Sequence, residues 1–329
     1  MGELFALAAQ NLLTPTILCF GLGMFAALAR SDLSVPEAAA KMMSIYLLFA
    51  IGFKGGVAVA GHGFDGLLAM ALLGGIALSF LLPILAFALL RAITRLSSLD
   101  AAAVAAHYGS ISIVTFVTAS AVLTSQGIAA EGFMVAVAAA MEAPAIVSAM
   151  WLAARSGGGD AAQVKADARL WREIMLNGSI VLLVGAFLVG AVTGEAGMSR
   201  IDAFIVAPFQ GVLCLFLLDM GIVAGRGLRS ARNVITMGLL AFGIAMPLLG
   251  AAAGLAMALL IGLGTGGTAL MMTLAASASY IAVPAAMRVA LPAANPAVSL
   301  TLSLGITFPF NLIFGIPAYL AVAKAVIGA

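Results

Sequence analysis

Long apolar segments separated by short polar stretches dominate this chain. A segment of about 20 apolar residues is long enough to cross a bilayer as a helix. The hydropathy pattern predicts about ten such spans, near residues 11–30, 36–60, 66–91, 100–124, 131–154, 177–194, 203–225, 233–262, 267–291 and 298–327. We therefore expect an all-α polytopic membrane protein.

The ninth apolar segment contains AASASYIAVP, residues 275–284, which is poorly suited to an unbroken helix. Ser277, Ser279 and Tyr280 lie close together, and Pro284 removes a backbone donor and clashes with the preceding turn. Backbone groups freed at this depth cannot face lipid, so they must line a cavity enclosed by protein. The pattern predicts one half of a solute site.

The fourth apolar segment has a matching pattern, AAHYGSISIVTFVTAS, residues 105–120. Both segments contain a Ser-x-Ser pair, an adjacent aromatic hydroxyl (Tyr108 or Tyr280) and small residues before the pair. Interrupted segments at corresponding positions of two halves are typical of the binding sites of secondary transporters. We expect broken helices in spans four and nine.

The distribution of basic residues predicts how the chain is oriented. Most of them fall in one set of loops, namely Arg30, Arg91, Arg95, Arg155, Lys165, Arg169, Arg172, Arg226, Arg229, Arg232 and Arg288. Only Arg200 and Lys324 lie near span ends on the other side. Cytoplasmic loops carry an excess of Lys and Arg, so the first set should be cytoplasmic and both termini outside.

Five spans in each half would insert the two halves in opposite directions, which is the inverted-repeat plan of many transporters. We predict a first five-helix repeat at residues 1–155 and a second at 173–329. A cytoplasmic linker, residues 156–172, joins them, and an interfacial helix is expected in DARLWREIM, residues 167–175.

Composition supports this class and excludes others. The chain is 64% hydrophobic and 9% charged, whereas soluble domains are about 25% charged. Fifteen basic residues dispersed in loops do not form a nucleic-acid patch. Cys19 and Cys214 lie in apolar spans and indicate neither a disulfide framework nor a zinc site. No catalytic motif is present, so we expect no enzyme activity and no cofactor.

Two half-helices that begin near mid-membrane would each present partial positive charge and unpaired N–H groups to one cavity. Hydroxyl groups at the two interruptions add neutral hydrogen-bonding partners. The predicted site for a small monovalent anion comprises Ser110, Ser112, Thr115, Ser277, Ser279 and Tyr280. The alternative is that these hydroxyls only pack helices or bond to nearby carbonyls.

Glu142 lies in span five, where a carboxylate is costly and is therefore functional or a protonated structural group. The corresponding region of span ten, GITFPFNLIFG, is interrupted by Thr307, Pro309 and Asn311. Oxygen atoms of Glu142, Thr307 and Asn311 are of the kind that Na⁺ uses beside unwound backbone. We predict cation or proton coupling there.

Three further polar residues are candidates for the pathway. Lys54 in span two and Asp219 in span seven occupy similar repeat positions. The two side chains could pair with each other or line the transport pathway. Alternatively, Lys54 extends its ammonium group to the membrane interface. His107 precedes the interruption of span four. It is either a proton relay or a hydrogen-bonded packing residue.

Several segments resemble the sodium-dependent bicarbonate transporter family of bacteria, whose best-known members are cyanobacterial. The resemblance is carried by Thr14–Pro15–Thr16, VPEAAAK (35–41), IGFKGG (51–56), YGSIS (108–112), MEAPA (141–145) and AASASYIAVPAAMRVALPAANP (275–296). It runs nearly from end to end.

The resemblance implies a ten-helix inverted-repeat fold with a mobile core, a scaffold and an anion site where two broken helices cross. It also implies an elevator-like mechanism, a homotrimer and a multi-pass protein of the bacterial inner membrane. The chain departs from the family pattern at Tyr280, where relatives have Asp, and at Ile113 and Val283, which are bulkier. The short cytoplasmic loop does not favour docking of a PII-like regulator.

The sequence therefore predicts a secondary active transporter for a small inorganic anion, with Na⁺-coupled bicarbonate uptake as the first hypothesis. One alternative is a sodium- or proton-coupled carrier of another small anion or carboxylate. A second is a membrane sensor or interaction subunit that transports nothing.

Overall fold

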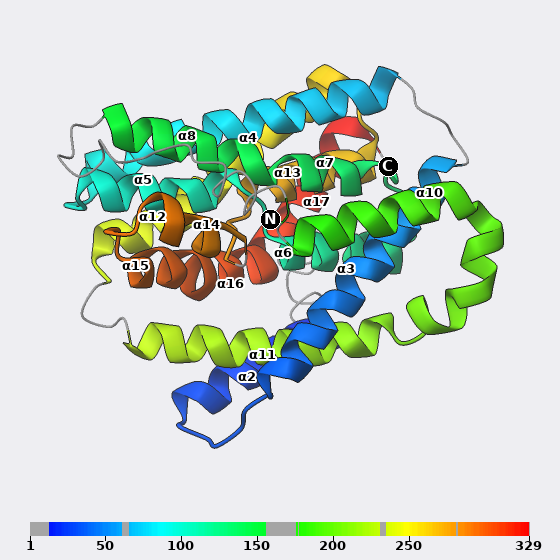
Figure 1. Ribbon diagram of the computed structural model, residues 1–329, viewed down its shortest axis with the longest axis horizontal. Helices are drawn as coiled ribbons and strands as arrows, with labels where there is room; N and C mark the ends of the chain where they lie inside the picture. The colour runs from blue at the N-terminus through cyan, green and yellow to red at the C-terminus, as the bar shows by residue number, and fades with distance from the viewer. Residues whose placement is uncertain are drawn as a thin grey trace.

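The computed structural model describes residues 13–60, 66–155, 176, 178–230, 235–280 and 282–328. All regular elements within these ranges are helical (Figure 1). The whole of the predicted linker, residues 156–172, and the helix expected at residues 167–175 lie outside the described residues.

The amino-terminal half contains α2 (Pro15–Leu28), α3 (Glu37–Ala60), α4 (Gly66–Ile93), α5 (Ser98–Gly109), α6 (Ile113–Ser125), α7 (Met134–Ala140) and α8 (Glu142–Arg155). The carboxy-terminal half begins with α10 (Gly178–Ile205), α11 (Phe209–Ser230), α12 (Met237–Ile261), α13 (Thr265–Ala276) and α14 (Ala282–Ala290). It ends with α15 (Pro296–Leu300), the π-helix η2 (Thr301–Thr307), α16 (Phe308–Phe310), the π-helix η3 (Asn311–Gly315) and α17 (Ile316–Ile327).

Among the described residues, eight helical stretches are long and apolar enough to cross a membrane. They are Glu37–Ala60, Gly66–Ile93, Ser98–Ser125, Met134–Arg155, Ile180–Ile205, Phe209–Arg229, Met237–Ile261 and Pro296–Ile327. Helix α2 is a shorter apolar helix. The prediction of an all-α, multi-pass membrane protein is confirmed, and the number ten and the inverted repeat stay predictions.

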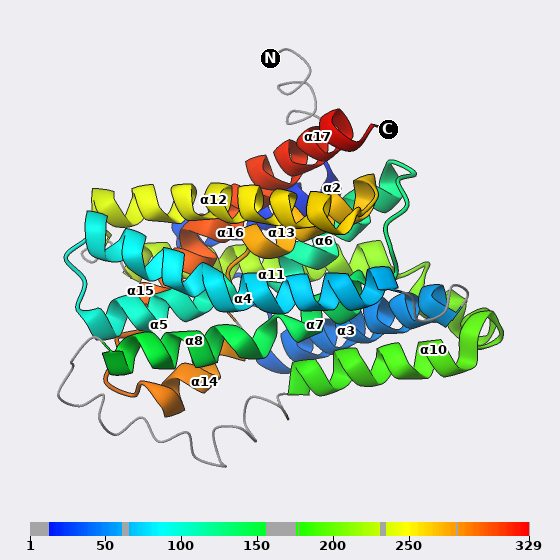
Figure 2. The same cartoon turned by 90° about the horizontal axis from the view of Figure 1, so that it is seen from above.

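The helices pack as two groups. The first helix group consists of α2, α3, α10 and α11, in which α3 packs along α10 and α2 along α11. In Figure 1 it occupies the lower and right-hand sides, and Figure 2 shows α10 beside α3. The second helix group consists of α4 to α8 and α12 to α17, with extensive α4–α5, α5–α8 and α12–α13 contacts.

Glycines allow close packing within the first helix group. A Cβ at Gly56 on α3 would lie 1.9 Å from the carbonyl oxygen of Phe187 on α10. A Cβ at Gly23 on α2 would lie 2.0 Å from the carbonyl oxygen of Leu218 on α11. Small residues at such positions let helix backbones approach closely, which favours association where lipid supplies no hydrophobic drive.

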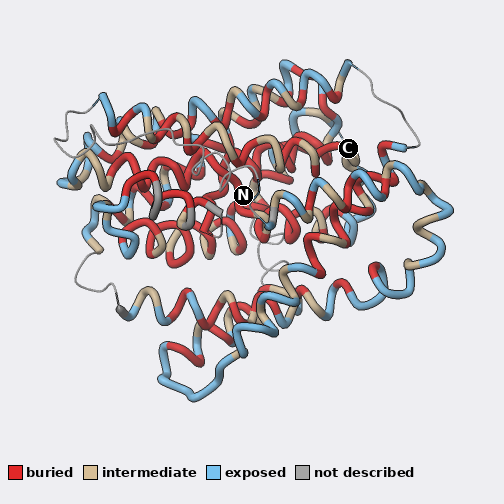
Figure 3. Tube along the Cα trace, in the orientation of Figure 1, coloured by how far each residue is buried: buried red, intermediate tan, exposed pale blue. Residues whose placement is uncertain are grey.

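The centre of the molecule is the stretch that contains α5 and α6. The apolar part of Ser98–Ser125 is 100% buried, whereas that of Ile180–Ile205 in α10 is only 22% buried. Figure 3 shows the same contrast between the buried interior and the exposed outer helices. Polar side chains of α5 and α6 therefore have to find their partners inside the protein.

Candidate functional site

The chain between α5 and α6 lies against the chain between α13 and α14. Helix α5 ends at Gly109 and α6 begins at Ile113, with Ser110 and Ser112 in extended conformation. Helix α13 ends at Ala276, and Ser277 continues in extended conformation. All the serines of both stretches are buried.

We call these two stretches the crossing (residues 110–112 and 277–280). Three hydrogen bonds hold it together, two of them made by His107 in the last turn of α5 and one by Ser112. The Ser279 amide donates to the His107 carbonyl oxygen at 2.7 Å, and His107 Nδ1 lies 2.6 Å from the Ser279 carbonyl oxygen. The Ser112 amide donates to Ser277 Oγ at 2.9 Å. Two polar stretches 165 or more residues apart in the chain thus share one buried location.

Ser112 also starts helix α6. Its hydroxyl oxygen accepts hydrogen bonds from the Thr115 amide at 3.2 Å and from Thr115 Oγ1 at 2.9 Å. Among the described residues, the amides of Ile113 and Val114 have no acceptor. This helix start therefore offers unpaired N–H groups and the positive end of a helix dipole inside the protein.

Tyr280 belongs to the same buried region. Its ring packs edge-on against Phe308, with the ring centroids 5.4 Å apart. Its hydroxyl group faces Ser112 without meeting the geometry of a hydrogen bond, and it has no other partner among the described residues. A buried hydroxyl without a partner is costly, so this group is free to bind a ligand.

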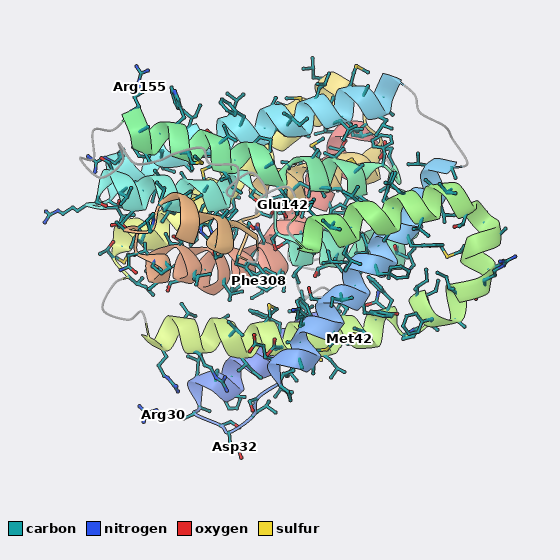
Figure 4. All side chains as sticks on the ribbon, viewed as in Figure 1. Arg30, Asp32, Met42, Glu142, Arg155 and Phe308 are labelled. Carbon is teal, nitrogen blue, oxygen red and sulfur yellow. The ribbon has the colours of Figure 1, made fainter. Side chains whose placement is uncertain are left out.

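Glu142 is the first residue of α8 and lies in the interior, 4% exposed. Ser110 Oγ donates to its Oε2 atom at 2.5 Å, which connects the carboxyl group to the crossing. Figure 4 places Glu142 near the middle of the molecule and Arg155 at the far end of the same helix. Within the described residues, no ion pair forms at Glu142.

The other two predicted cation ligands make separate contacts. Thr307 donates to the Gly243 carbonyl oxygen at 2.8 Å and lies 2.7 Å from the Tyr108 hydroxyl. Asn311 Nδ2 donates to the Ala276 carbonyl oxygen at 2.9 Å, at the end of α13. No hydrogen bond joins either residue to Glu142, and the described residues contain no cluster of three or more His, Cys, Asp or Glu side chains.

Tyr319 was not among the predicted site residues. Its hydroxyl donates to Asn311 Oδ1 at 2.8 Å and so orients the amide that supports α13. Both Asn311 and Thr307 belong to π-helices, which are often found at functional sites. Tyr319 lies in an ordinary apolar helix pattern, and the sequence carries no signal that pairs it with Asn311.

Lys54 and Asp219 do not pair. Lys54 Nζ lies 4.6 Å from the ring centroid of Phe209, a cation–π contact. Asp219 is 7% exposed and lies in α11. His107, by contrast, is tied into the crossing by its bonds to Ser279.

Two cavities lie on either side of α5 and α6. The larger, about 330 Å³, is lined by Lys54 of α3, by one face of α6 and by Phe209 of α11. The smaller, about 90 Å³, is lined by His107 of α5 and by Met287 of α14. The crossing thus has a cavity on its α6 side and another on its α5–α14 side.

Comparison with curated proteins finds no match. The family model described as the Na⁺-dependent bicarbonate transporter superfamily matches residues 15–324. This match covers nearly the whole chain, including both stretches of the crossing and Glu142. The chain therefore belongs to the Na⁺-dependent bicarbonate transporter superfamily.

Proposed function

We propose that the protein is a secondary active transporter that couples Na⁺ to the uptake of bicarbonate. The observation that carries this proposal is the crossing, where two non-helical stretches meet in the protein interior, joined by the Ser112–Ser277 hydrogen bond and by the bonds of His107 to Ser279. Family membership supports the substrate and the coupling ion.

The proposed anion site uses neutral donors and a helix start. The unpaired amides of Ile113 and Val114 and the free hydroxyl of Tyr280 supply donors, and Ser110, Ser112, Thr115, Ser277 and Ser279 surround them. A helix start carries about half a positive charge, which suits a monovalent anion. Because no Arg–anion pair has to break, release into the cell is easy.

Glu142 is the proposed coupling residue, because its carboxyl group touches Ser110 at the crossing. Na⁺ bound near Glu142 would offset its charge and fix Ser110. Thr307 Oγ1 and Asn311 Oδ1 are the further proposed ligands, and Asn311 Oδ1 now accepts a hydrogen bond from Tyr319. Asp, which relatives have at the position of Tyr280, is absent, so Glu142 would be the carboxylate ligand.

Proton coupling is the second candidate, and a specific observation favours it. The hydrogen bond that Glu142 makes is to a neutral hydroxyl, and no cation lies against it within the described residues. A carboxyl group so placed can carry a proton instead of a metal ion. Uptake driven by a pH gradient without Na⁺ would support this candidate over Na⁺ coupling.

The proposed architecture has ten spans in two inverted five-helix repeats, with broken helices in spans four (α5–α6) and nine (α13–α14). Each helix group then takes two or three spans from each repeat, which supports the proposal. In an elevator-like cycle, the second helix group carries the crossing past the first. We propose a homotrimer in the bacterial inner membrane with both termini outside.

A panel of anions tests the substrate. Purified protein is reconstituted in liposomes, and uptake of labelled bicarbonate is competed with nitrate, sulfate, formate and acetate, with and without Na⁺. We expect bicarbonate uptake only with Na⁺, and weak competition from the dianion sulfate. Uptake of another anion in place of bicarbonate would overturn the assignment of bicarbonate as the substrate. Equal amounts of label in empty liposomes would overturn the assignment of the protein as a transporter.

A further inference from the structure

The 330 Å³ cavity lies between the two helix groups, and the charged group of Lys54, which is not part of the crossing, lines it. Lys54 of α3 and Phe209 of α11 line it from the first group, and Phe116, Ser120 and Thr124 of α6 line it from the second. A water molecule occupies about 30 Å³ in the liquid, so a small anion fits with part of its hydration shell.

Among the residues that the structure describes, Lys54 is the sole Lys or Arg side chain that lines this cavity. It is half-buried, its ammonium group lies over the Phe209 ring, and no ion pair with a described carboxylate neutralises it. An ammonium group in a partly enclosed space attracts anions more strongly than one in open water.

Glu131, the acidic side chain that lines the cavity, is engaged elsewhere. Its Oε1 atom accepts a hydrogen bond from the Gly264 amide at 2.7 Å, at the start of α13. Its Oε2 atom is buried, has no hydrogen-bond partner among the described residues, and lies against Gly267, where a Cβ would be 2.0 Å away. The positive end of α13 therefore offsets this carboxylate, and the charge of Lys54 remains available.

The cavity leads towards the crossing along one face of α6. Thr124, Ser120 and Phe116 are four residues apart and line the cavity, and the next position in this register is Ser112. The Phe116 side chain is 2% exposed, lines the cavity, and is one helical turn from Ser112. The same helix face thus carries hydroxyls, an aromatic barrier and then the proposed anion site.

We propose that this cavity is an access site in which Lys54 concentrates a small monovalent anion before it passes Phe116 to reach Ser112. The proposal rests on the proposed function for its anion and for the direction of movement. It assigns to Lys54 a role in capturing the anion and none in holding it at the crossing.

Thiol labelling tests the site without measuring transport. Ser120→Cys is made in a Cys19→Ala/Cys214→Ala background, and its labelling by an anionic sulfonate reagent is compared with that by a cationic ammonium reagent of similar size. Rates are normalised to a free thiol in solution. We expect the anionic reagent to be favoured on the order of fivefold, as one nearby charge would produce.

Variants of Lys54 then test whether its charge causes the preference for the anionic reagent. Lys54→Gln and Lys54→Met should each abolish it, and Lys54→Arg should retain it. Lys324→Gln is the matched control, because Lys324 donates to Gln126 just beyond α6 and does not line the cavity. This control should leave the preference unchanged.

Two results would overturn the proposal: an introduced thiol that neither reagent reaches, or a preference that survives both Lys54→Gln and Lys54→Met in protein that elutes as folded. Failure of the proposed function looks different. Bicarbonate uptake would then be absent while the Lys54-dependent preference remained.

Discussion

Ser112 combines two roles at one residue. It begins α6 by accepting from Thr115, and its amide donates to Ser277 across the crossing. We predict that Ser112→Ala raises the KM for bicarbonate at least tenfold, because the hydroxyl that orders the anion site is lost. The lost cap should cost about 1 kcal/mol of stability.

Thr118→Val is the control for this substitution. Thr118 is a buried hydroxyl on α6 whose one partner among the described residues is the Val114 carbonyl oxygen, at 2.8 Å. Initial uptake rates over a range of bicarbonate concentrations provide the measurement. A wild-type KM in Ser112→Ala would remove this residue from the anion site.

A substitution at Tyr280 can distinguish a role in binding the anion from a role in packing. Because its buried hydroxyl has no partner, Tyr280→Phe should leave the free energy of unfolding unchanged or increase it by about 1 kcal/mol. We predict that bicarbonate affinity nevertheless falls about tenfold, as expected for loss of one hydrogen bond to an anion. Thermal unfolding in detergent and equilibrium binding are measured on the same preparation. Lower stability with unchanged affinity would contradict the binding role.

Glu142→Gln tests coupling with little change in shape. The amide can still accept from Ser110, but its charge is gone. We predict that uptake loses its dependence on Na⁺ and no longer exceeds equilibrium, as measured with and without an inward Na⁺ gradient. Asp202→Asn, at an exposed carboxylate in α10, should keep the wild-type Na⁺ dependence. A Glu142→Gln protein that still accumulates bicarbonate would remove Glu142 from coupling.

At the scale of elements, close helix packing depends on single glycines. Gly56→Ala would place a methyl group 1.9 Å from the Phe187 carbonyl oxygen, so α3 and α10 must separate. We expect a loss of about 2 kcal/mol or more, within the range seen for overpacked interiors. Gly185→Ala on α10 is the control, because a Cβ there meets nothing within 4 Å. Thermal unfolding should distinguish them, and equal midpoints would contradict the packing.

The elements differ in how far the sequence predicts them. Ser-x-Ser pairs in the fourth and ninth apolar segments, the second followed by Pro284, indicated interruptions because such residues disfavour a continuous apolar helix. Helix α5 ends at Gly109 and α13 at Ala276, directly before these pairs. The π-helical turns at Thr307 and Asn311 contain side chains that bond to Gly243, Tyr108 and Tyr319. Local sequence patterns contain no information about such partners.

For the candidate site too, the sequence predicts some of the residues that meet and misses the partners of others. Serines 110, 112, 277 and 279 share a location because α5 and α13 meet, which a repeated motif can suggest. The proposed link between Glu142, Thr307 and Asn311 rested on composition at span depth. Their side chains bond to separate sets of neighbours and not to one another. A shared depth in the membrane says little about which side chains contact each other, whereas a motif repeated in both halves suggests that the two copies meet.

At the scale of the whole molecule, the account requires the two helix groups to move past each other. Gly55→Cys/Val135→Cys would link α3 of the first group to α7 of the second, where the two Cβ atoms would be 3.0 Å apart. Disulfides need about 3.5–4.5 Å, so a small separation suffices. We predict that oxidation stops uptake and that a reductant restores it.

The matched control is Gly52→Cys/Ala186→Cys, which links α3 to α10 within the first group at a Cβ separation of 2.9 Å. Oxidation of this pair should leave uptake intact. Equal uptake by the oxidised and reduced Gly55→Cys/Val135→Cys protein, with the cross-link verified, would exclude a cycle in which these groups move.

The most direct test of coupled transport is the accumulation of labelled bicarbonate in proteoliposomes under an inward Na⁺ gradient. One Na⁺ with one bicarbonate is electroneutral, so the concentration gradient of Na⁺ alone should drive uptake above equilibrium. A membrane potential would add about 2.3 kcal/mol per 100 mV only if a second Na⁺ moved. We predict transient accumulation that collapses when the Na⁺ gradient is dissipated. Uptake that never exceeds equilibrium, or that is indifferent to Na⁺, would contradict the account.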